Sequence, residues 1–392
     1  MGSEWKEYEL KDILTISYGK SLTKKDRIPG NYNVYGSGGV IGTNKNYLVE
    51  GPGIIIGRKG TVGSVYYEKG NFYPIDTTYY IEKSEKYDIK FIYYMLRQAR
   101  LDKMNSHSAV PGLNREDLYR LKFRIPEKPE QQKIASILSA FDDKIELNNE
   151  MNKTLEEIAQ AIFKHWFIDF EFPNENGEPY KSSGGEFVDS ELGLIPKGWE
   201  VERLGGSKIS KLLTSGIEQF ENKKIYLATA DVEGTRIINR TTRITYDDRP
   251  SRANMQPKAR TIWFARMKDS KKLILVDDFS KDIIDNYIFS TGFAGIECFN
   301  FSLYYLWCFI CNDNFESIKN ALCNGTTMQA INNENINKIN ILIPSEQILI
   351  DFHNIIKPLY EMIYHLDMQN TYLIQIRDTL LPKLISGEIR VM

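Results

Sequence analysis

Two long stretches of the chain repeat one pattern of hydrophobic positions. The first covers residues 134–166, and the second, 218 residues later, covers 352–384. In both, the pattern recurs at alternating intervals of four and three, the 3.5-residue repeat of a coiled-coil seam. The seam positions are Ile134, Leu138, Phe141, Ile145, Asn148, Asn152, Leu155, Ala159, Ile162 and Trp166, then Phe352, Ile356, Leu359, Ile363, Leu366, Asn370, Leu373, Arg377, Leu380 and Leu384. This pattern predicts two long helices that pack on each other.

Polar residues and prolines modify this prediction. Asn152 and Asn370 fall at the same seam position of the two stretches. An asparagine in a seam costs stability but fixes the register of the helices, so we expect both residues to set the register. Pro358 and Pro382 lie inside the second stretch. Because proline removes a helical hydrogen bond, we expect a first turn or two, a break, and the main helix from about Leu359.

The repeat extends into the β-rich segments that precede the long helices. Each segment opens with a Trp, four residues and a Leu, and closes with residues that match at an offset of 218. The matched residues are Trp5 with Trp199, Leu10 with Leu204, Leu113–Asn114 with Ile331–Asn332, Leu121 with Ile339, and Ile125–Pro126 with Ile343–Pro344. The interiors of the two segments have little resemblance. The frame is therefore repeated while its contents differ, as two modules that bind different ligands would require.

The local patterns predict an α+β fold. Apolar runs bounded by glycine predict strands, residues 89–100 and 303–311 predict short helices, and Asn114 is a predicted helix N-cap. The predicted strands are 53–57, 64–67 and 78–81. The predicted parts are a first α/β module at 1–126, a first long helix at 127–170, a linker at 171–198, a second α/β module at 199–344, and a second long helix with a tail at 345–392. The linker is acidic, aperiodic and rich in Pro, Gly and Asn.

Charge alternates along the chain, although the net charge is only −2. Residues 1–126 carry a net +6 and residues 197–281 a net +7, whereas residues 127–192 carry −9 and residues 282–392 carry −6. The two basic segments would attract a polyanion such as DNA, and the two acidic segments would repel it.

Two further features narrow the class of protein. The chain has no apolar stretch near the ~20 residues that cross a bilayer and no signal-peptide pattern, so we expect a cytoplasmic protein without membrane contact. Its cysteines all fall in one late segment, as Cys298, Cys308, Cys311 and Cys323. The CxxC among them sits in an apolar run without a second ligand pair, so we expect buried thiols and no metal site.

The order of module, long helix, module and long helix resembles the specificity subunit of type I restriction–modification systems. The stretches that carry the resemblance are VYGSGGVIG (34–42), GRKGTVGSV (57–65), YPIDTTYYI (73–81), SAVPGLNREDLYRLKFRIPEKPEQQKIASIL (108–138), HWFIDFEFP (165–173), LGLIPKGWEVERLG (192–205), TIWFARMKDSKK (261–272) and LLPKLISGEIRV (380–391). They cover essentially the whole chain. Their order, together with the 218-residue repeat, is a specific signature.

The resemblance implies a fold and a set of partners. The modules would be target recognition domains that each read one half of a split, asymmetric site in double-stranded DNA. The helices would form an antiparallel coiled coil of approximate two-fold symmetry that sets the spacer, so that lengthening it by a turn would alter the spacer alone. Two modification (methyltransferase) subunits would dock on it, and restriction/translocase subunits would join them. S-adenosylmethionine, ATP and Mg²⁺ would be bound by these partners, with no cofactor in this chain.

The resemblance implies no catalytic residue here, and the motifs agree. The chain has neither a glycine-rich cofactor loop nor an Asn/Asp-Pro-Pro motif, and the 57–63 loop lacks the GK[ST] of a P-loop. An alternative is a single-chain enzyme, for which a nuclease site could be built from Asp76, Asp88 and Lys90. Another is an orphan specificity protein that serves a different defence complex.

DNA contact in the first module is predicted at its glycine-rich loop. Glycines let the backbone approach phosphates, and Arg58, Lys59 and Thr61 lie between Gly57 and Gly63. An Arg can also pair with guanine in the major groove. The alternative is a tight surface turn with two solvated cations. The resemblance adds Tyr35 and Ser37 as a contact loop, and we also include His107 and Ser108, which precede the GLN turn.

In the second module a cluster of cations surrounds two aromatic residues. We expect phosphate contacts from Arg260, Arg266, Lys268, Lys271 and Lys272. Trp263 and Phe264 are expected in the core. Arg236, Arg240 and Arg243 recur at short intervals on a predicted loop or strand. For these three residues, DNA contact and a plain solvated face are equal alternatives.

Three aromatic residues close the first long helix, Phe163, Trp166 and Phe167. A seam between two helices does not need three aromatic side chains so close together. We expect them to bury against the linker or a docking partner. Near-zero exposure in the isolated chain would leave the partner role unsupported.

Overall fold

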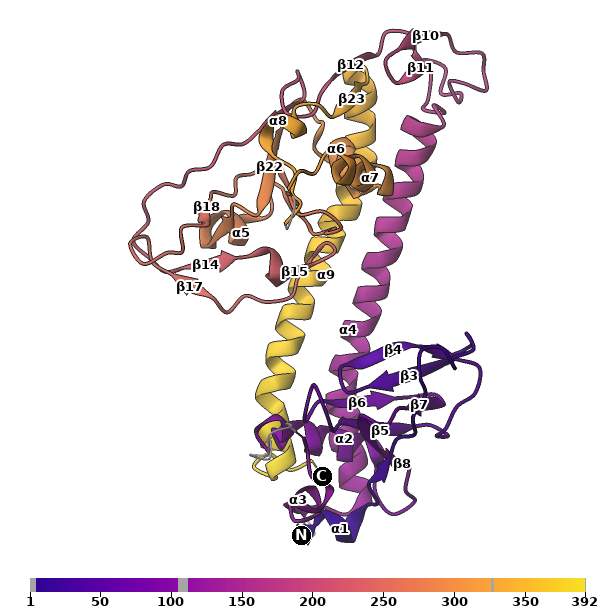
Figure 1. Ribbon diagram of the computed structural model, residues 1–392, viewed down its shortest axis with the longest axis vertical. Coiled ribbons are helices and arrows are strands. Elements are labelled where there is room, and N and C mark those ends of the chain that lie inside the picture. The colour runs from indigo at the N-terminus through magenta and orange to yellow at the C-terminus, as the bar shows by residue number, and fades with distance from the viewer. Residues whose placement is uncertain (1–4, 105–111, 326–327, 392) are drawn as a thin grey trace. The chain divides into compact units, whose positions relative to one another are not determined.

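The computed structural model describes residues 5–104, 112–325 and 328–391, and the chain divides into two compact units. Unit 1 comprises Met1–Asn148 with Met368–Met392, and unit 2 comprises Asn149–Asp367. The two long helices, α4 (Lys128–Phe163) and α9 (Glu346–Ser386), each contribute one segment to each unit. Within each unit the two helical segments lie side by side, and a β-rich module packs against them (Figure 1).

Unit 1 contains a frame and two sheets. Its frame is the antiparallel pair β1 (Lys6–Glu9) and β9 (Lys122–Ile125). One sheet has the order β2 (Ser17–Tyr18), β8 (Thr78–Glu82), β5 (Gly53–Gly57), β6 (Val65–Glu68), and the other has the order β4 (Gly39–Asn44), β3 (Tyr32–Gly36), β7 (Phe72–Pro74). Its short helices are α1 (Leu10–Ile13), α2 (Ile89–Gln98), the 3-10 turn η1 (Leu101–Lys103) and α3 (Arg115–Tyr119). The predicted strands and the predicted helix at 89–100 are confirmed.

Unit 2 contains the corresponding frame, β12 (Glu200–Arg203) paired with β23 (Asn340–Ile343). Its sheets have the orders β13 (Ser210–Leu212), β22 (Phe293–Cys298), β19 (Thr261–Ala265), β20 (Leu273–Val276), and β17 (Arg243–Ile244), β14 (Lys224–Leu227), β21 (Tyr287–Ser290), β18 (Ala253–Met255). The remaining elements are the π-turn η2 (Lys164–Ile168), β10 (Phe187–Ser190), β11 (Gly193–Pro196), η3 (Thr229–Asp231), β15 (Val232–Glu233), β16 (Arg236–Ile237), α5 (Lys281–Asn286), α6 (Leu303–Cys311), α7 (Asp313–Ala321) and α8 (Asn333–Ile336). The predicted helix at 303–311 is confirmed.

The two modules share one strand order even where their sequences do not match, except that β18 extends the second sheet of unit 2. In the smaller sheets, β3 pairs parallel with β7 and β14 pairs parallel with β21. In the frames, the Leu10 amide donates to the Leu121 carbonyl at 2.8 Å, and the Leu204 amide donates to the Ile339 carbonyl at 2.9 Å. The acceptors are 218 residues apart, so the sequence repeat corresponds to a structural repeat.

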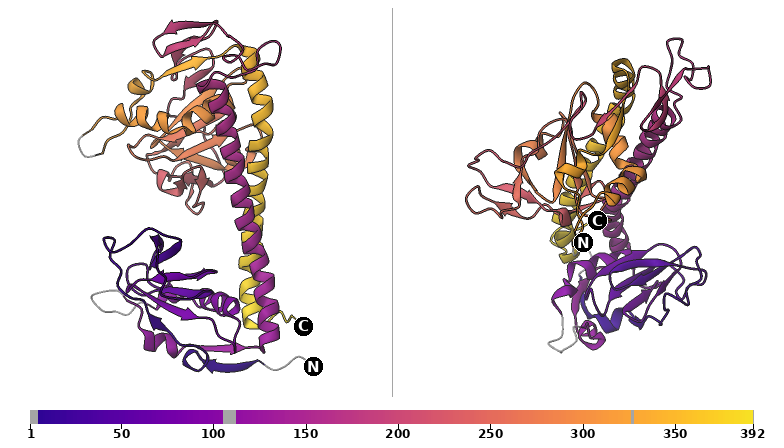
Figure 2. Two further views of the ribbon diagram at one scale, coloured as in Figure 1. Left: turned by 90° about the vertical axis from the view of Figure 1, so that its right-hand side faces the viewer. Right: turned by 45° about the horizontal axis from the view of Figure 1, so that its top comes forward.

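All 20 predicted seam positions are buried or half-buried. In unit 1, Asn148 donates to the Asn370 side chain at 2.8 Å, and Asp142 pairs with Arg377 at 2.5 Å. In unit 2, Asn152 donates to Asp367 at 2.7 Å. In unit 1 the partner's number falls along α9 as residue number rises along α4, so these segments are antiparallel (Figure 2). The predicted register residues therefore bond across the helices, but to other partners than each other.

The predicted break in the second long helix is wrong, because α9 is continuous through both prolines. Proline leaves the carbonyl four residues earlier without a helical donor. For Pro358 this carbonyl belongs to Asn354, and for Pro382 to Asp378, and both residues are exposed. Water can therefore satisfy each carbonyl, while Ile356 and the residues around it hold the helix through burial. The predicted linker also differs, since β10 and β11 form a hairpin within it.

Candidate nucleic-acid interface

The glycine-rich loop of unit 1 leaves the end of β5, a fully buried strand. Its first residue is held on both sides, because the Arg58 amide donates to the Thr77 carbonyl and the Leu113 amide donates to the Arg58 carbonyl, each at 2.9 Å. The start of the loop is therefore anchored to the sheet by backbone hydrogen bonds. The side chains of Lys59 and Thr61 are exposed beyond it.

The turn between β3 and β4 packs directly beside this loop. The Ser64 hydroxyl donates to the Ser37 carbonyl at 2.5 Å and to the Thr61 carbonyl at 3.1 Å. A Cβ added to Gly57 would lie 2.2 Å from the Thr61 carbonyl oxygen, so only glycine fits at this close approach. The structure thus brings Ser37 together with the predicted loop residues.

Tyr35 lies below this surface rather than on it. Its side chain is buried, and its hydroxyl donates to Glu68 at 2.9 Å. Burial, with the bond to the Glu68 carboxylate, raises the pKa of the Tyr35 hydroxyl. Of the two residues predicted in this turn, only Ser37 is at the surface. His107 and Ser108 lie outside the described residues.

Two residues that the sequence reasoning missed join the loop in space. The Arg58 guanidinium lies 5.2 Å from the ring centre of Tyr18, and the Arg115 guanidinium lies 5.0 Å from the same ring. Arg58 also donates to the Asp76 carbonyl at 3.0 Å. The Tyr18 ring is 45% exposed, so two cations flank an accessible aromatic face. We call Tyr18, Ser37, Arg58, Lys59, Thr61 and Arg115 the basic surface of unit 1.

Unit 2 places Arg266 where unit 1 places Arg58. Arg266 follows β19, its amide donates to the Gly292 carbonyl, and the Ile331 amide donates to its carbonyl, each at 2.9 Å. Ile331 and Leu113 are 218 residues apart, so these bonds are equivalent in the two modules. The side chains differ, however. The Arg266 guanidinium donates to the carbonyls of Phe293 and Ile331, and burial lowers its pKa.

The other predicted cations of unit 2 do not form one cluster. Lys268 is exposed, but Lys271 pairs with Asp313 at 2.6 Å and Lys272 donates to the Thr229 carbonyl at 2.7 Å. Arg260 lies at the opposite end of β19 and pairs with Asp278 at 3.1 Å. The five-residue strand separates it from Arg266 by roughly 16 Å or more. Within this stretch, Trp263 and Phe264 are fully buried, which confirms their predicted place in the core.

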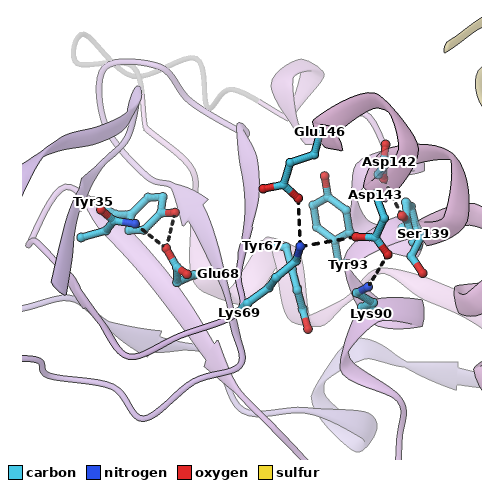
Figure 3. Close-up of a pocket in the computed structure, with 12 residues that line it drawn as sticks. Tyr35, Tyr67, Glu68, Lys69, Lys90, Tyr93, Ser139, Asp142, Asp143 and Glu146 are labelled. Carbon is cyan, nitrogen blue, oxygen red and sulfur yellow. Dashed lines mark hydrogen bonds and ion pairs between the residues drawn. The ribbon is translucent and has the colours of Figure 1, made fainter. Parts of the chain in front are cut away.

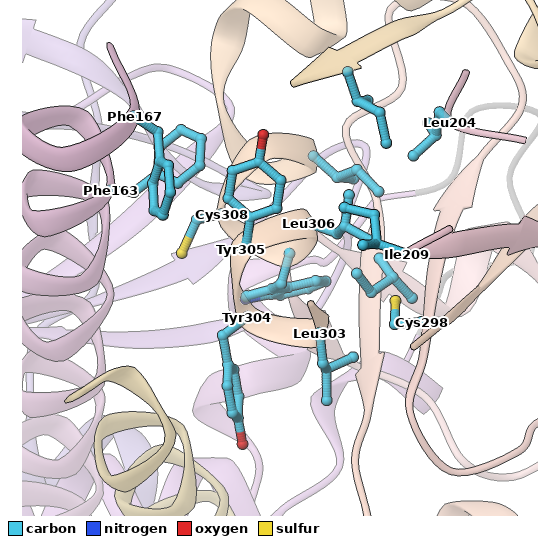
Figure 4. Packing of buried hydrophobic residues seen from close by; sticks show 14 of the residues in the cluster. Phe163, Phe167, Leu204, Ile209, Cys298, Leu303, Tyr304, Tyr305, Leu306 and Cys308 are labelled. Atoms are coloured by element: carbon cyan, nitrogen blue, oxygen red, sulfur yellow. The ribbon is translucent and has the colours of Figure 1, made fainter. Parts of the chain in front are cut away.

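The three aromatic residues predicted for partner docking are buried in unit 2 itself. Phe163, Trp166 and Phe167 are each 7% exposed or less. Phe167 lies 4.6 Å from Tyr305 and 5.9 Å from Trp199, measured between ring centres. Figure 4 shows Phe163 and Phe167 beside Tyr305 of α6. The side chains turn inward because the helix end is covered by the module and by the chain after the linker. Their burial leaves the partner role unsupported.

A polar cavity of about 400 Å³ lies between the first module and α4 in unit 1 (Figure 3). Lys69 pairs with Glu146 at 2.9 Å and with Asp143 at 3.4 Å, and Lys90 pairs with Asp143 at 3.8 Å. The Tyr94 hydroxyl donates to Asp142 at 2.5 Å. These contacts join the module to the helix.

The residues considered for a nuclease site have separate structural roles. The Asp88 side chain caps α2 by accepting from the Phe91 amide at 2.9 Å, and Lys90 faces Asp143. Asp76 is exposed in the turn where its carbonyl binds Arg58. Among the residues that the structure describes, no group of three or more His, Cys, Asp or Glu could hold a metal ion. In the same part of the chain, none of the helices combines the length and apolarity of a membrane span.

The chain is similar to known proteins over most of its length. Residues 2–157 match the family described as "Type I restriction modification DNA specificity domain". The type I restriction enzyme MjaIX specificity subunit of Methanocaldococcus jannaschii is 30% identical over 315 residues, which cover 77% of this chain and 69% of that protein. The HindI specificity subunit of Haemophilus influenzae is 26% identical over 341 residues, 71% of each chain.

A solved structure supports the fold. The S subunit of a type I restriction–modification system from M. genitalium aligns with a TM-score of 0.59 at 19% identity, over 97% of this chain and 96% of that chain. At this identity the likeness concerns the fold alone. The MjaIX relative and the family match together carry the assignment. The chain belongs to the family of type I restriction–modification specificity subunits.

Proposed function

We propose that this chain is the non-catalytic subunit that selects the DNA sequence, with each module reading one half of a bipartite, asymmetric site. The observation that carries the proposal is the equivalent loop of the two modules. Arg58 and Arg266 leave corresponding strands with the same backbone bonds, yet the side chains around them differ. One frame that presents two different surfaces suits a site whose halves are unlike.

In unit 1 we assign DNA contact to the basic surface. Arg58 and Arg115 lie half-buried beside the exposed Tyr18 ring, and arginine can bind phosphates or pair bidentately with guanine. Lys59 and Thr61 extend this surface to the loop tip. In unit 2 the exposed Lys268 is the cation best placed for a phosphate, and Arg266 supports the loop from below.

We also propose that two modification subunits bind to the long helices and that restriction subunits join the complex. S-adenosylmethionine, ATP and Mg²⁺ would be bound by these partners. The docking residues that we propose in unit 2 are the exposed apolar side chains Met151 and Ile158 on α4, and Ile355 and Met362 on α9. Each pair is seven residues apart and therefore on one helix face. They replace the buried aromatic residues in this role.

Methylome sequencing tests the proposed function. Cells that express this chain with its modification subunit should carry methylated adenines in one bipartite motif, and cells without this chain should lack that motif. The Met151→Glu/Ile158→Glu variant should lose both the motif and co-purification of the modification subunit. Adenine methylation that does not depend on this chain would contradict the assignment.

Two direct assays separate the alternatives. The purified chain incubated with DNA, Mg²⁺ and S-adenosylmethionine should neither cleave nor methylate it. Either activity would support a single-chain enzyme instead. A pull-down that recovers other machinery without the modification subunit would support an orphan specificity protein.

A further inference from the structure

A lysine is buried under the candidate DNA-contact loop of unit 2. Lys319, on α7, has a side chain only 1% exposed. Its ammonium lies 3.1 Å from the Met267 carbonyl oxygen, 3.1 Å from that of Ser270 and 3.4 Å from that of Ala265. It also pairs with Glu316 at 2.8 Å. One side chain therefore binds the beginning and the middle of the loop that joins β19 to β20.

The chemistry of an ammonium explains why a charge is placed here. A buried charge is costly unless it is paired and hydrogen-bonded, and lysine supplies three donors and no acceptor. The loop turns three backbone carbonyls toward the buried ammonium. The ammonium supplies the missing donors, and Glu316 balances its charge. With its carbonyls held from below, the loop keeps Met267 and Lys268 exposed on the outside.

Asn320, next to Lys319 on α7, holds the tip of the same loop. Its side chain accepts from the Asp269 amide at 3.0 Å and donates to the Asp269 carboxylate at 3.0 Å. Asp269 has a φ of 53°, in the left-handed region that non-glycine residues rarely adopt. The two hydrogen bonds to Asn320 stabilise this conformation. Two consecutive residues of α7 thus hold the loop, in addition to the backbone bonds of the Arg266 amide to Gly292 and of the Lys268 amide to Gln329.

The equivalent loop of unit 1 is held by a different device. Gly63, with a φ of 77°, packs so closely on η1 that an added Cβ would lie 2.2 Å from the Asp102 amide nitrogen. There the backbone itself contacts the supporting turn. In unit 2 the side chains of α7 add to the backbone bonds of the loop, so a change in α7 can alter the loop without a change in the loop sequence.

We propose that Lys319 is a positioning residue that fixes the 266–272 loop and thereby determines how strictly the second module selects its half-site. This inference rests on the proposed function, because it takes the loop to contact DNA. The residue itself touches no DNA. It acts by binding the loop backbone, and Asn320 binds Asp269 of the same loop.

Two measurements on the Lys319→Met variant of the full chain test this proposal. The first is hydrogen exchange of the 266–272 amides, which should become faster by roughly tenfold or more as the loop loses its support. The second is the methylome of cells that express the variant with the modification subunit. One half-site should become degenerate, with discrimination at some positions reduced by about fivefold or more, while the other half-site stays unchanged. Lys338→Met, at an exposed lysine of the same unit, should change neither measurement.

The outcomes distinguish the inference from the function on which it rests. Unchanged exchange of the loop amides would overturn the positioning role. Faster exchange with both half-sites unchanged would show a loop that Lys319 holds but that does not select DNA, and would overturn the recognition role of the loop. Degeneracy in both half-sites would indicate general loss of structure and count against the proposal. If Lys319→Met does not fold, Asn320→Ala applies the same two measurements at a half-buried side chain.

Discussion

At the scale of single residues, Arg58 and Arg266 occupy equivalent positions in the two modules, but their side chains have different partners. Both residues are half-buried, but the Arg58 guanidinium lies over the exposed Tyr18 ring, whereas the Arg266 guanidinium binds two backbone carbonyls. The same residue type thus serves two purposes. In unit 1 it is available to a ligand, and in unit 2 it satisfies the Phe293 and Ile331 carbonyls.

We therefore expect Arg58→Ala and Arg266→Ala to have different effects. Arg58→Ala should change the free energy of unfolding by less than about 0.5 kcal/mol but weaken DNA binding of the assembled complex. Arg266→Ala should cost about 1–3 kcal/mol, because it leaves buried carbonyls without donors. Urea unfolding and DNA titration measure the two effects. Lys11→Ala, which removes an exposed cation of unit 1, is the charge control for Arg58. Equal loss of stability in the two arginine variants would contradict this distinction.

The DNA titration at several salt concentrations also shows what Arg58 contacts. Loss of a phosphate contact should reduce the slope of log affinity against log salt by about one, and weaken all sequences equally. Loss of a base contact should instead relax the motif at one position.

The candidate site was predictable only where the chemistry is local in sequence. Arg58 and Lys59 stand between glycines, and that pattern indicated a loop with charge. Tyr18 and Arg115 were missed because they meet Arg58 through the fold, from β2 and the start of α3, and β2 is only two residues long. For Phe163 and its neighbours, the apolar pattern identified burial but could not distinguish the chain's own core from a partner.

At the scale of elements, the long helices were predictable because their hydrophobic period is regular over many turns. It was harder to predict which residues contact each other across the two helices. Asn152 and Asn370 are equivalent in sequence, but residues at equivalent positions of two antiparallel helices meet only at the centre of symmetry. Each therefore bonds to another residue, Asp367 and Asn148 respectively. The period predicts which residues are buried, and the direction of the helices decides which residues they contact.

The continuity of α9 gives a prediction for its first proline. In Pro358→Ala the new amide can donate to the Asn354 carbonyl, and alanine has a higher helix propensity than proline. We expect a gain of about 1–3 kcal/mol in the free energy of unfolding, reduced somewhat by the greater freedom of the unfolded chain. Urea unfolding of the full chain measures it. Met362→Ala, at an exposed position one turn later, should change stability by less than about 0.5 kcal/mol. Loss of stability in Pro358→Ala would mean that the proline ring packs favourably.

The seam of unit 2 should make stability depend on pH. Burial raises the pKa of the Asp367 carboxyl, and nearby Arg236 and Arg240 only partly offset this. Because the folded pKa lies above the unfolded one, the folded state binds more protons between the two values. Stability is then greatest below the unfolded pKa, about 3.9, and falls as pH rises through the folded pKa.

Asp367→Asn removes this titration and keeps an oxygen to accept from Asn152. The variant should be more stable than the parent at pH 7, with little difference near pH 3.5. Urea midpoints across that range measure it. Asp189→Asn, at an exposed residue of the same unit, should follow the parent chain. A parent that gains stability from pH 4 to pH 7 relative to Asp367→Asn would refute the sign.

At the scale of the whole molecule, the frame was predictable and the sheets were not. The repeated Trp, Leu and Ile-Pro positions correspond to the paired strands β1–β9 and β12–β23. The sheet order inside each module depends on strands of two to six residues, several of which pair with strands far apart in sequence, such as β2 with β8 and β14 with β21. Such short strands carry little periodic signal. The two interiors therefore share their strand order, apart from the additional β18 in unit 2, although their sequences show little similarity.

The continuous helices support a final prediction about spacing. α4 has 36 residues and α9 has 41, so each is roughly 54–62 Å long at 1.5 Å per residue. Inserting one heptad into each helix, after Asn148 and after Asp367, preserves the 3.5-residue seam and adds about 10.5 Å. At 3.4 Å per base pair, the methylated spacer should lengthen by about three base pairs, with both half-sites unchanged.

The control places the same seven residues after Gly184, an exposed position in the linker before β10, where the spacer should stay as it is. The methylome of each strain measures the spacer directly. If the heptad variant methylates the original motif with its original spacer, the helices do not set the distance. Loss of methylation in the heptad variant, with its fold intact, would equally contradict a simple ruler, because both half-sites would no longer be read together.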